Sequence, residues 1–338
     1  MKKYLTFDKF RLFASILIIA IHTYPLFMIN ENLDFVFTHV FCRIAVPFFL
    51  MITGYFVIEK ATRNKDFLIN YTIKTLKLYL FCILLYFPIN IYAKTFETSN
   101  IISVLKDIFI NGTFYHLWYF PALILGLWIL YFLLKKLKGK KVIVILSILY
   151  IIGIFGDSLG NLSLNIAYIK DIYKVIFSIF DYTRNGIFYV PIFLYLGYLF
   201  RKTKFNISRS KNVILIIIFI LLMIVEGIIY NKFDLQIHDS MYFMLPIVMV
   251  LIFNLILQNS NENNKSLRNI STIIYITHPL FIIFVRGVGK ILNLENIIVD
   301  NNLIHYILVV LTTVIFSICF EKLSCRVRLK YEQKFNKK

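Results

Sequence analysis

The chain alternates along its whole length between long apolar runs and short polar segments. Ten of the runs come close to the roughly 20 apolar residues that cross a bilayer as a helix, although the fifth and sixth are short. The pattern therefore predicts an all-α fold, a polytopic bundle of about ten transmembrane helices. The predicted spans are Phe10–Ile29, Val36–Ile58, Tyr71–Ala93, His116–Leu134, Val142–Phe155, Thr183–Phe200, Val213–Tyr230, Met241–Leu257, Ile270–Arg286 and Leu303–Phe320.

The composition agrees with a membrane protein. Of the 338 residues, 59% are hydrophobic and 16% are charged, whereas a soluble domain is typically about 45–50% apolar and about 25% charged. The mean hydropathy is +0.75. These values exclude a soluble multidomain enzyme and a disordered protein. Four cysteines in 338 residues are also too sparse for a secreted disulfide scaffold.

The distribution of charge predicts the orientation. A net charge of +19 in a soluble protein would suggest a nucleic-acid partner. With ten spans both termini lie on one side, and 28 of the 37 Lys and Arg fall in segments on that side, against 8 on the other. Because basic residues mark cytoplasmic loops, we predict a cell-membrane protein with both termini in the cytoplasm and no nucleic-acid partner. The inner face would then attract anionic lipids of the bilayer or an anionic donor.

The two ends of the chain and one long polar segment between spans bear on the domain organisation. The first run is too long for a cleavable signal peptide and lacks a small-residue cleavage site, so we expect a retained helix. The final span is followed by a basic tail, residues 321–338, and the whole of 1–338 is predicted to be one membrane domain. The outer segment 156–182 is too polar to span, and a surface-lying helix is predicted around Ala167–Phe180.

The first span carries a polar stripe. Arg11 and His22 are eleven residues apart, about 20° beyond three full turns of an α-helix, so both lie on one face. Asp8 and Ser15 fall on the same face. Such a stripe is expected to face the bundle interior or a water-filled cavity. With a pKa near 6.5, His22 can exchange a proton at physiological pH; alternatively, it only bonds to a neighbouring helix.

Four further polar residues lie in or next to predicted spans, and each is either structural or functional. Arg43, in the second span, either extends its charge to the membrane surface or pairs with an anion, such as Glu226 in the seventh span or a substrate carboxylate. His116 opens the fourth span beside Trp and Tyr residues that fit an interfacial belt. His278 lies within the ninth span.

The outer segments hold polar residues that could together line an acceptor site, namely Asp157, Arg184, His238 and Asp239. His238, Asp239 and Ser240 are consecutive, but a catalytic triad is assembled in space and not from adjacent residues. The cysteines are scattered, without the spacing of zinc ligands, and no phosphate-binding loop or dinucleotide fingerprint occurs. We therefore expect no bound metal or cofactor and no direct coupling to ATP.

The first two spans resemble those of the acyltransferase-3 family of integral membrane proteins. Phe7-Asp8-Lys9-Phe10-Arg11 leads into His22, and VPFFLMITGY follows at 46–55. The first helix of that family carries an Arg and a His with ten residues between them, as Arg11 and His22 do here. The resemblance extends over most of the chain, including 116–119 and 276–280. It implies transfer of an acyl group from a cytoplasmic donor, usually an acyl-coenzyme A such as acetyl-coenzyme A, to an acceptor reached from the outer face.

Within that family the chain is similar to the membrane half of the vancomycin-resistance serine racemases. That half has been linked to the supply of serine across the membrane. The racemase half, which would need a Schiff-base Lys for pyridoxal phosphate, does not occur within these 338 residues. The similar segments are Gly112–Tyr119, Phe155–Ser158, Tyr182–Gly186, His238–Tyr242 and Val285–Gly287.

Two positions depart from the family pattern. Many members have Ser-Gly-Phe where this chain has Thr53-Gly54-Tyr55. At the start of the third span they have two Arg three residues apart, where this chain has Lys74 and Lys77. Lys binds phosphate as a point charge without the bidentate fork of Arg, so donor binding is expected to differ.

These observations lead to one main hypothesis, a membrane acyltransferase of the cell envelope. His22 would be the general base or a transient acyl carrier, and Arg11 with Lys74 and Lys77 would meet the phosphates of the donor. His116 and the outer polar residues would address a small-molecule or glycan acceptor.

Two alternatives stay open. One is transport of L-serine or a similar small amino acid, with Arg43 and Glu226 pairing with the zwitterion; His278 is a further candidate contact to substrate. The other is a non-catalytic scaffold for a separate racemase or cell-wall enzyme.

Overall fold

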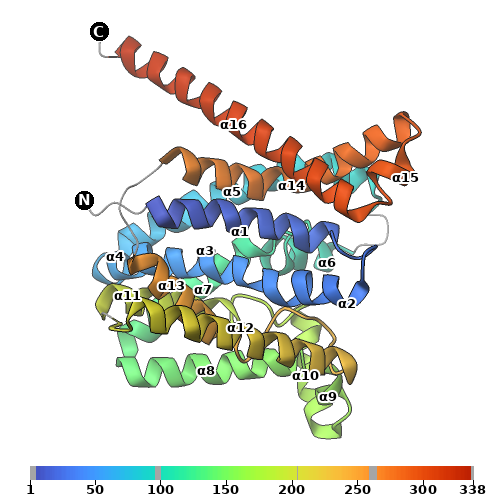
Figure 1. Cartoon of the computed structure of the whole chain (residues 1–338). Helices are drawn as coiled ribbons and strands as arrows, with labels where there is room; N and C mark the ends of the chain where they lie inside the picture. Colours follow the sequence, from blue (N-terminus) through green and yellow to red (C-terminus); the bar gives the residue numbers. More distant parts are fainter. Residues whose placement is uncertain (1–4, 96–99, 204, 259–264, 336–338) are drawn as a thin grey trace. The chain divides into compact units, whose positions relative to one another are not determined.

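The computed structural model describes residues 5–95, 100–203, 205–258 and 265–335, and all regular structure in these ranges is helical (Figure 1). The all-α prediction is therefore confirmed. The helices form two compact units that interleave along the chain. Unit 1 combines Met1–Val46 with Leu255–Lys338, and unit 2 is Pro47–Asn254.

Unit 1 is built on three long helices that pack against one another through buried apolar side chains, among them Ile19, Ile274 and Val309 (Figure 1). The amide of Asn302, at the start of the last helix, donates a 3.3 Å bond to the carbonyl of Thr23 at the end of the first. The last helix therefore runs antiparallel to the first. The helices are α1 (Leu5–Thr23), α2 (Glu31–Asp34), π-helix η1 (Phe35–Val40), 3₁₀-helix η2 (Phe41–Ile44), α14 (Lys265–Ile291), α15 (Glu295–Ile298) and α16 (Asn302–Phe335).

Unit 2 holds the central part of the chain, and its first and last helices extend a few residues into unit 1. Its helices are α3 (Ala45–Thr53), π-helix η3 (Gly54–Ile58), α4 (Glu59–Arg63), α5 (Lys65–Tyr92), α6 (Ile101–Lys106), π-helix η4 (Asp107–Asn111), α7 (Tyr119–Lys136), α8 (Gly139–Phe155), α9 (Gly160–Leu164), α10 (Ala167–Ile179), α11 (Val190–Lys202), α12 (Arg209–Lys232) and α13 (Leu245–Gln258).

Every predicted span contains a helix, but not every helix is long enough to cross a membrane unaided. In the described residues, six helical stretches are both long and apolar enough. The ten-span topology and the cytoplasmic placement of both termini stay predictions. The six stretches are Glu31–Arg63, Lys65–Tyr92, Tyr119–Lys136, Arg209–Lys232, Ser266–Ile291 and Asn302–Val327.

The sixth predicted span, Thr183–Phe200, is only partly helical. α11 begins at Val190, because the Asn185 side chain accepts the amide of Ile187 at 2.8 Å and holds the preceding residues in a turn. The helix has 13 residues, which is about 20 Å and short of the roughly 30 Å hydrocarbon core.

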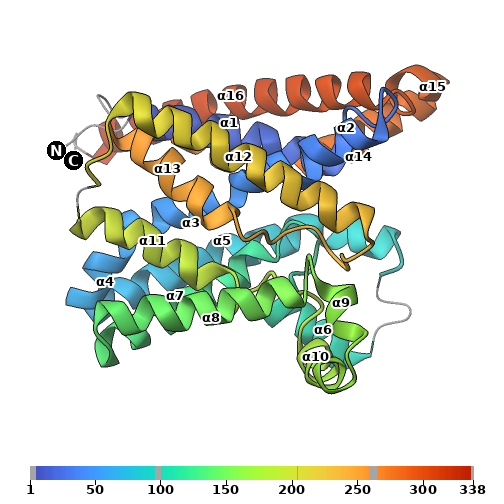
Figure 2. The ribbon, with the colours of Figure 1, turned by 60° about the horizontal axis from the view of Figure 1, so that its bottom comes forward.

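One predicted helix is confirmed, and another is longer than predicted. The helix predicted around Ala167–Phe180 is confirmed as α10, which lies beyond the end of α8 (Figure 2). It exposes Tyr168 and Ile172 and buries Tyr173. α16 continues well past Phe320, where the last span was predicted to end, so most of the predicted tail is helical.

Two glycines allow helices of unit 2 to touch backbone to backbone. A Cβ atom on Gly54 would lie 2.9 Å from the Cα atom of Leu194, and one on Gly197 would lie 2.8 Å from that of Met51. Real Cβ atoms essentially never come this close to a backbone atom. α11 therefore packs directly against α3 and η3, with small residues at the interface as in many membrane helix pairs.

Candidate functional site

The polar stripe of α1 meets α14 inside unit 1. Asp8 is buried and forms an ion pair with Arg11 one turn later, and its carboxylate lies 3.6 Å from Nε of Arg268 on α14. Two guanidinium groups, one from each helix, therefore lie close to the same buried carboxylate near the N-terminal ends of α1 and α14.

His22 and His278 meet further along the same two helices. Their rings stack with centroids 5.5 Å apart and an interplanar angle of 19°. The Asp8–Arg268 and His22–His278 contacts occur in the same order along both helices, so α1 and α14 run parallel. The stripe predicted on α1 thus contacts α14 through Asp8 and His22.

Pro279 explains why His278 is held in place. Proline has no amide hydrogen, so the Tyr275 carbonyl four residues earlier cannot accept the usual helical bond from residue 279. Nδ1 of His278 lies 2.9 Å from that carbonyl and 3.1 Å from the carbonyl of Ile274. Because carbonyls only accept hydrogen bonds, Nδ1 carries the proton of the neutral ring and Nε2 keeps the lone pair. His278 is fully buried.

Ser15, from the polar stripe, and Arg43, from the second predicted span, form hydrogen bonds with nearby backbone carbonyls in unit 1. Ser15 is buried and donates to the carbonyl of Leu12 in its own helix. Nε of Arg43, on η2, donates to the carbonyl of His39 at 3.4 Å. His39 was not singled out by the sequence, and its ring stacks on those of Tyr24 and Phe35, with centroids 5.4 Å away in each case.

In unit 2, Arg184 lies at the centre of a group of residues that includes others from the predicted outer segments. Its guanidinium carbon is 4.6 Å from the ring centre of Trp118 and 5.4 Å from that of Tyr182. Nη1 also donates a 2.9 Å bond to the hydroxyl of Ser240. The ring of His238 lies 4.6 Å from that of Tyr182. The structure therefore places Arg184 and His238 around two aromatic rings and a serine that the prediction did not assign to the site.

Asp157 holds the loop that carries His238, Asp239 and Ser240. It is fully buried, and its Oδ1 accepts the amides of Ser240 at 2.6 Å and Met241 at 3.0 Å. Its backbone carbonyl also accepts the amide of His238 at 3.3 Å. Asp239 is half-buried in this loop. Asp157 thus acts on the site by fixing the loop.

Glu226 has a similar structural role on the far side of that loop. Its carboxylate accepts the amides of Phe243 at 2.6 Å and Met244 at 3.0 Å, and the hydroxyl of Tyr230 at 2.9 Å. Its predicted pairing with Arg43 would join the two units and stays a prediction.

His116 is buried in an aromatic environment close in sequence to Trp118. Its ring lies 4.9 Å from that of Tyr86 on α5, 5.8 Å from that of Phe114 and 5.6 Å from that of Tyr115. Rings on several sides hold the imidazole at the edge of the loop that contributes Trp118 to the Arg184 group.

The predicted donor-binding lysines, Lys74 and Lys77, are exposed one turn apart on α5. The sequence did not suggest a second basic group, centred on Glu59. Oε2 of Glu59 is 3.0 Å from Nε of Arg201, and Oε1 is 3.3 Å from Nζ of Lys202 and 2.7 Å from Nη2 of Arg63. Arg201 is 142 residues from Glu59, too far for helical spacing to indicate the contact.

The described residues contain no group of three or more His, Cys, Asp or Glu placed to hold a metal ion.

We expect Asp157→Ala to destabilise the protein by about 3 kcal/mol, because two buried amides lose their acceptor at roughly 1–3 kcal/mol each. The expected signs are a lower unfolding temperature of the detergent-solubilised protein and faster proteolysis at residues 235–244. Asp171→Ala is the matched control, since that carboxylate is 73% exposed and such surface changes cost little. Equal unfolding temperatures and proteolysis rates for the two variants would contradict the role given to Asp157.

The fold and these side chains belong to a multi-pass membrane protein of the acyltransferase-3 family. The acyltransferase domain of that family matches residues 4–322, so the match runs through both units. The prediction from Arg11, His22 and the second-span motif is confirmed at the level of the family.

Three curated relatives are named as racemases. The chain is 39% identical to an amino-acid racemase of Enterococcus faecalis over 97% of this chain and 46% of that protein. A second amino-acid racemase of Enterococcus faecalis is 35% identical over 96% of this chain and 47% of that protein. A serine/alanine racemase of Enterococcus gallinarum is 36% identical over 93% of this chain and 45% of that protein. The chain thus spans about half the length of these relatives. No solved structure matches it.

Proposed function

We propose that this chain moves an acyl group, in particular an acetyl group, from a cytoplasmic acyl-coenzyme A to an acceptor at the outer face of the cell membrane. Membership of the acyltransferase-3 family supports acyl transfer as the reaction class. The single observation that carries the residue assignment is the contact of His22 with His278 inside unit 1. Two histidines in contact, one held in a defined tautomer, suit a site that moves protons.

In the proposed reaction His22 is the general base. It takes the proton of an acceptor hydroxyl while that oxygen attacks the thioester carbonyl carbon. A new C–O bond forms, the C–S bond breaks, and the proton passes from His22 to the departing thiolate. In the carrier form of the reaction, a nitrogen of the neutral His22 imidazole attacks the thioester carbonyl carbon, the C–S bond breaks, and the ring proton leaves with the thiolate. The acceptor oxygen then attacks the acyl-imidazole, the C–N bond breaks, and the acceptor's proton returns to the ring. His278, packed on His22, would orient the ring in either case.

The donor would be bound through its phosphates. The guanidinium groups of Arg11 and Arg268, both close to Asp8, would lie near the cytoplasmic end of α1 in the predicted topology. The exposed Lys74 and Lys77 would add point charges without bidentate geometry. No bound metal or cofactor enters this reaction.

The acceptor would be held by the Arg184 group of unit 2. Trp118 and Tyr182 offer aromatic faces, and Arg184, His238 and Asp239 offer polar contacts, a combination suited to a glycan or a small polar molecule. Asp157 and Glu226 would act through the loop that they anchor. His116, held among aromatic rings, would line the acceptor site.

The test is a transfer assay with the purified chain in proteoliposomes. Acetyl-coenzyme A labelled in the acetyl group is supplied on one side and cell-envelope extract on the other. The proposal expects labelled extract and one free thiol for each acetyl group transferred. Thiol release and labelling at the rate of protein-free liposomes would contradict it.

The names of the relatives favour one second function, the movement of a small amino acid such as L-serine across the membrane for a separate racemase. Uptake of labelled L-serine into proteoliposomes without any acyl donor distinguishes the two. Saturable uptake would support transport, and background uptake together with acyl transfer would support the enzyme.

A further inference from the structure

Unit 2 contains a cavity that none of the proposed catalytic or binding residues lines. It has a volume of about 140 Å³ and lies between the end of α5 and the segment formed by α6 and η4. A dry apolar cavity of roughly 150 Å³ can hold a molecule the size of benzene. Its described lining residues are Ile83, Phe87, Asn90, Thr95, Val104, Asp107, Ile108 and Thr113.

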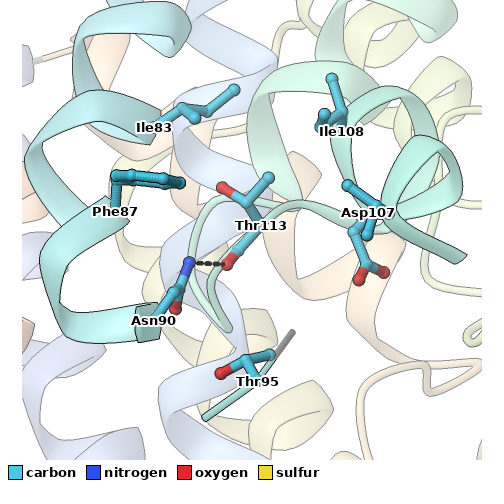
Figure 3. A pocket seen from close by; sticks show the side chains of 8 residues that line it. Ile83, Phe87, Asn90, Thr95, Asp107, Ile108 and Thr113 are labelled. Atoms are coloured by element: carbon cyan, nitrogen blue, oxygen red, sulfur yellow. Dashed lines mark hydrogen bonds between the residues drawn. The ribbon is translucent and has the colours of Figure 1, made fainter. Parts of the chain in front are cut away.

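One part of the cavity wall is apolar and the other is polar. Figure 3 shows Ile83 and Phe87 on α5 across from Ile108 and Asp107 on η4, with Thr113 between them. The amide of Asn90 donates a 2.8 Å bond to the carbonyl of Thr113 and so joins the two sides. A ligand that fills this space needs an apolar body and one polar end.

The polar end has hydrogen-bonding capacity left over. The Oγ1 atom of Thr113 is buried and has no hydrogen-bond partner in the described part of the chain. The Asp107 carboxyl accepts a hydrogen bond from the Asn111 side chain, and burial raises its pKa above the usual value. A partly buried carboxylate and an unpaired hydroxyl both suit a ligand that donates hydrogen bonds.

The charge around the cavity favours a cation over a zwitterion. The ammonium of Lys106, next to Asp107 in sequence, lies 3.6 Å from the carboxylate of Asp181 and donates to the carbonyl of Ser178 at 3.2 Å. Among the described lining residues none is basic. A ligand carboxylate would therefore have no charged partner in the wall, whereas a ligand ammonium would have Asp107.

We propose that this cavity binds small organic ammonium compounds with an apolar body of about six heavy atoms. The ammonium pairs with the carboxylate of Asp107, and the body packs against the apolar wall contributed by α5, α6 and η4. This site is independent of the acyl-transfer proposal, because it shares no residue with the donor or acceptor groups.

The test is binding of benzylamine to the full chain in lipid nanodiscs, followed by saturation-transfer NMR at about pH 8, where a carboxyl with a raised pKa is still ionised. We expect saturable binding to the wild type and a dissociation constant at least tenfold larger for Asp107→Asn. Asn keeps the shape of the side chain and removes a partly buried charge, so this variant should still fold. Val104→Phe, which fills the cavity, should abolish saturable binding.

Three controls make the outcome decisive. Asp171→Asn, which changes an exposed carboxylate on α10, should bind benzylamine as the wild type does. Benzyl alcohol, which has the same body without a charge, and L-serine, which is a zwitterion, should both bind at least tenfold more weakly. Equal affinity of the wild type and Asp107→Asn for benzylamine, or L-serine binding as tightly as benzylamine, would overturn the proposal.

Discussion

His22→Gln should lower the rate of acyl transfer by roughly 10²- to 10⁴-fold, the usual contribution of a general base. Gln keeps a polar side chain of similar length on α1 but cannot take up a proton. If His22 instead carries the acyl group, transfer should fall to background, because no covalent intermediate forms. The measurement is initial rate in the proteoliposome assay at matched protein density, with the unfolding temperature recorded for each variant.

The matched control is His305→Gln. His305 is another histidine of unit 1, it is buried, and its Nδ1 lies 3.2 Å from a backbone carbonyl, that of Ile298. It is not part of the proposed site, so its replacement should leave the rate within a few-fold of the wild type. His22→Gln with wild-type activity and normal folding would remove His22 from the mechanism. Similar losses in both variants would point to a general effect on unit 1.

Gly197→Ala should destabilise unit 2 by about 3 kcal/mol or more, at or above the upper end of typical overpacking costs. The added Cβ atom would meet the carbonyl group and Cα atom of Met51, which are backbone atoms and cannot rotate away. α11 would have to move off α3, and the neighbouring contact of Gly54 with Leu194 would open with it. The thermal unfolding midpoint of the purified protein measures this effect.

Gly287→Ala provides the comparison for that measurement. Gly287 lies within α14, and a Cβ atom there would meet nothing within 4 Å. Because Ala favours a helix over Gly by about 1 kcal/mol, this variant should be as stable as the wild type or slightly more stable. A Gly197→Ala midpoint as high as that of Gly287→Ala would contradict the backbone contact between α11 and α3.

The pattern of apolar runs predicted where the helices lie but overestimated the length of α11. The span was predicted to begin at Thr183, yet the side chain of Asn185 holds the following residues in a turn and α11 begins only at Val190, a local effect that a hydropathy average ignores. The polar stripe of α1 was predictable because it depends only on helical geometry. The contact of this stripe with α14 could not be predicted, because nothing near His22 in the sequence indicates that His278 lies beside it.

The roles of the outer carboxylates show a second limit. From the sequence, Asp157 and Glu226 are free charges available to a substrate. In the structure their oxygens accept backbone amides of residues 240–244, and an amide carries no signal in the sequence. Asp157, Arg184 and His238 all lie in segments predicted to share one side of the membrane, and a common acceptor site for them stays a prediction.

The most direct test of the proposed function is mass spectrometry of cell-envelope glycans and small metabolites from cells that express the wild type, His22→Gln or His305→Gln at equal levels. Acyl transfer predicts an envelope component heavier by one acyl group in cells with the wild type and with His305→Gln. The same component should be unmodified in cells with His22→Gln. An acylation pattern identical in all three, and identical to that of cells without the protein, would contradict the account.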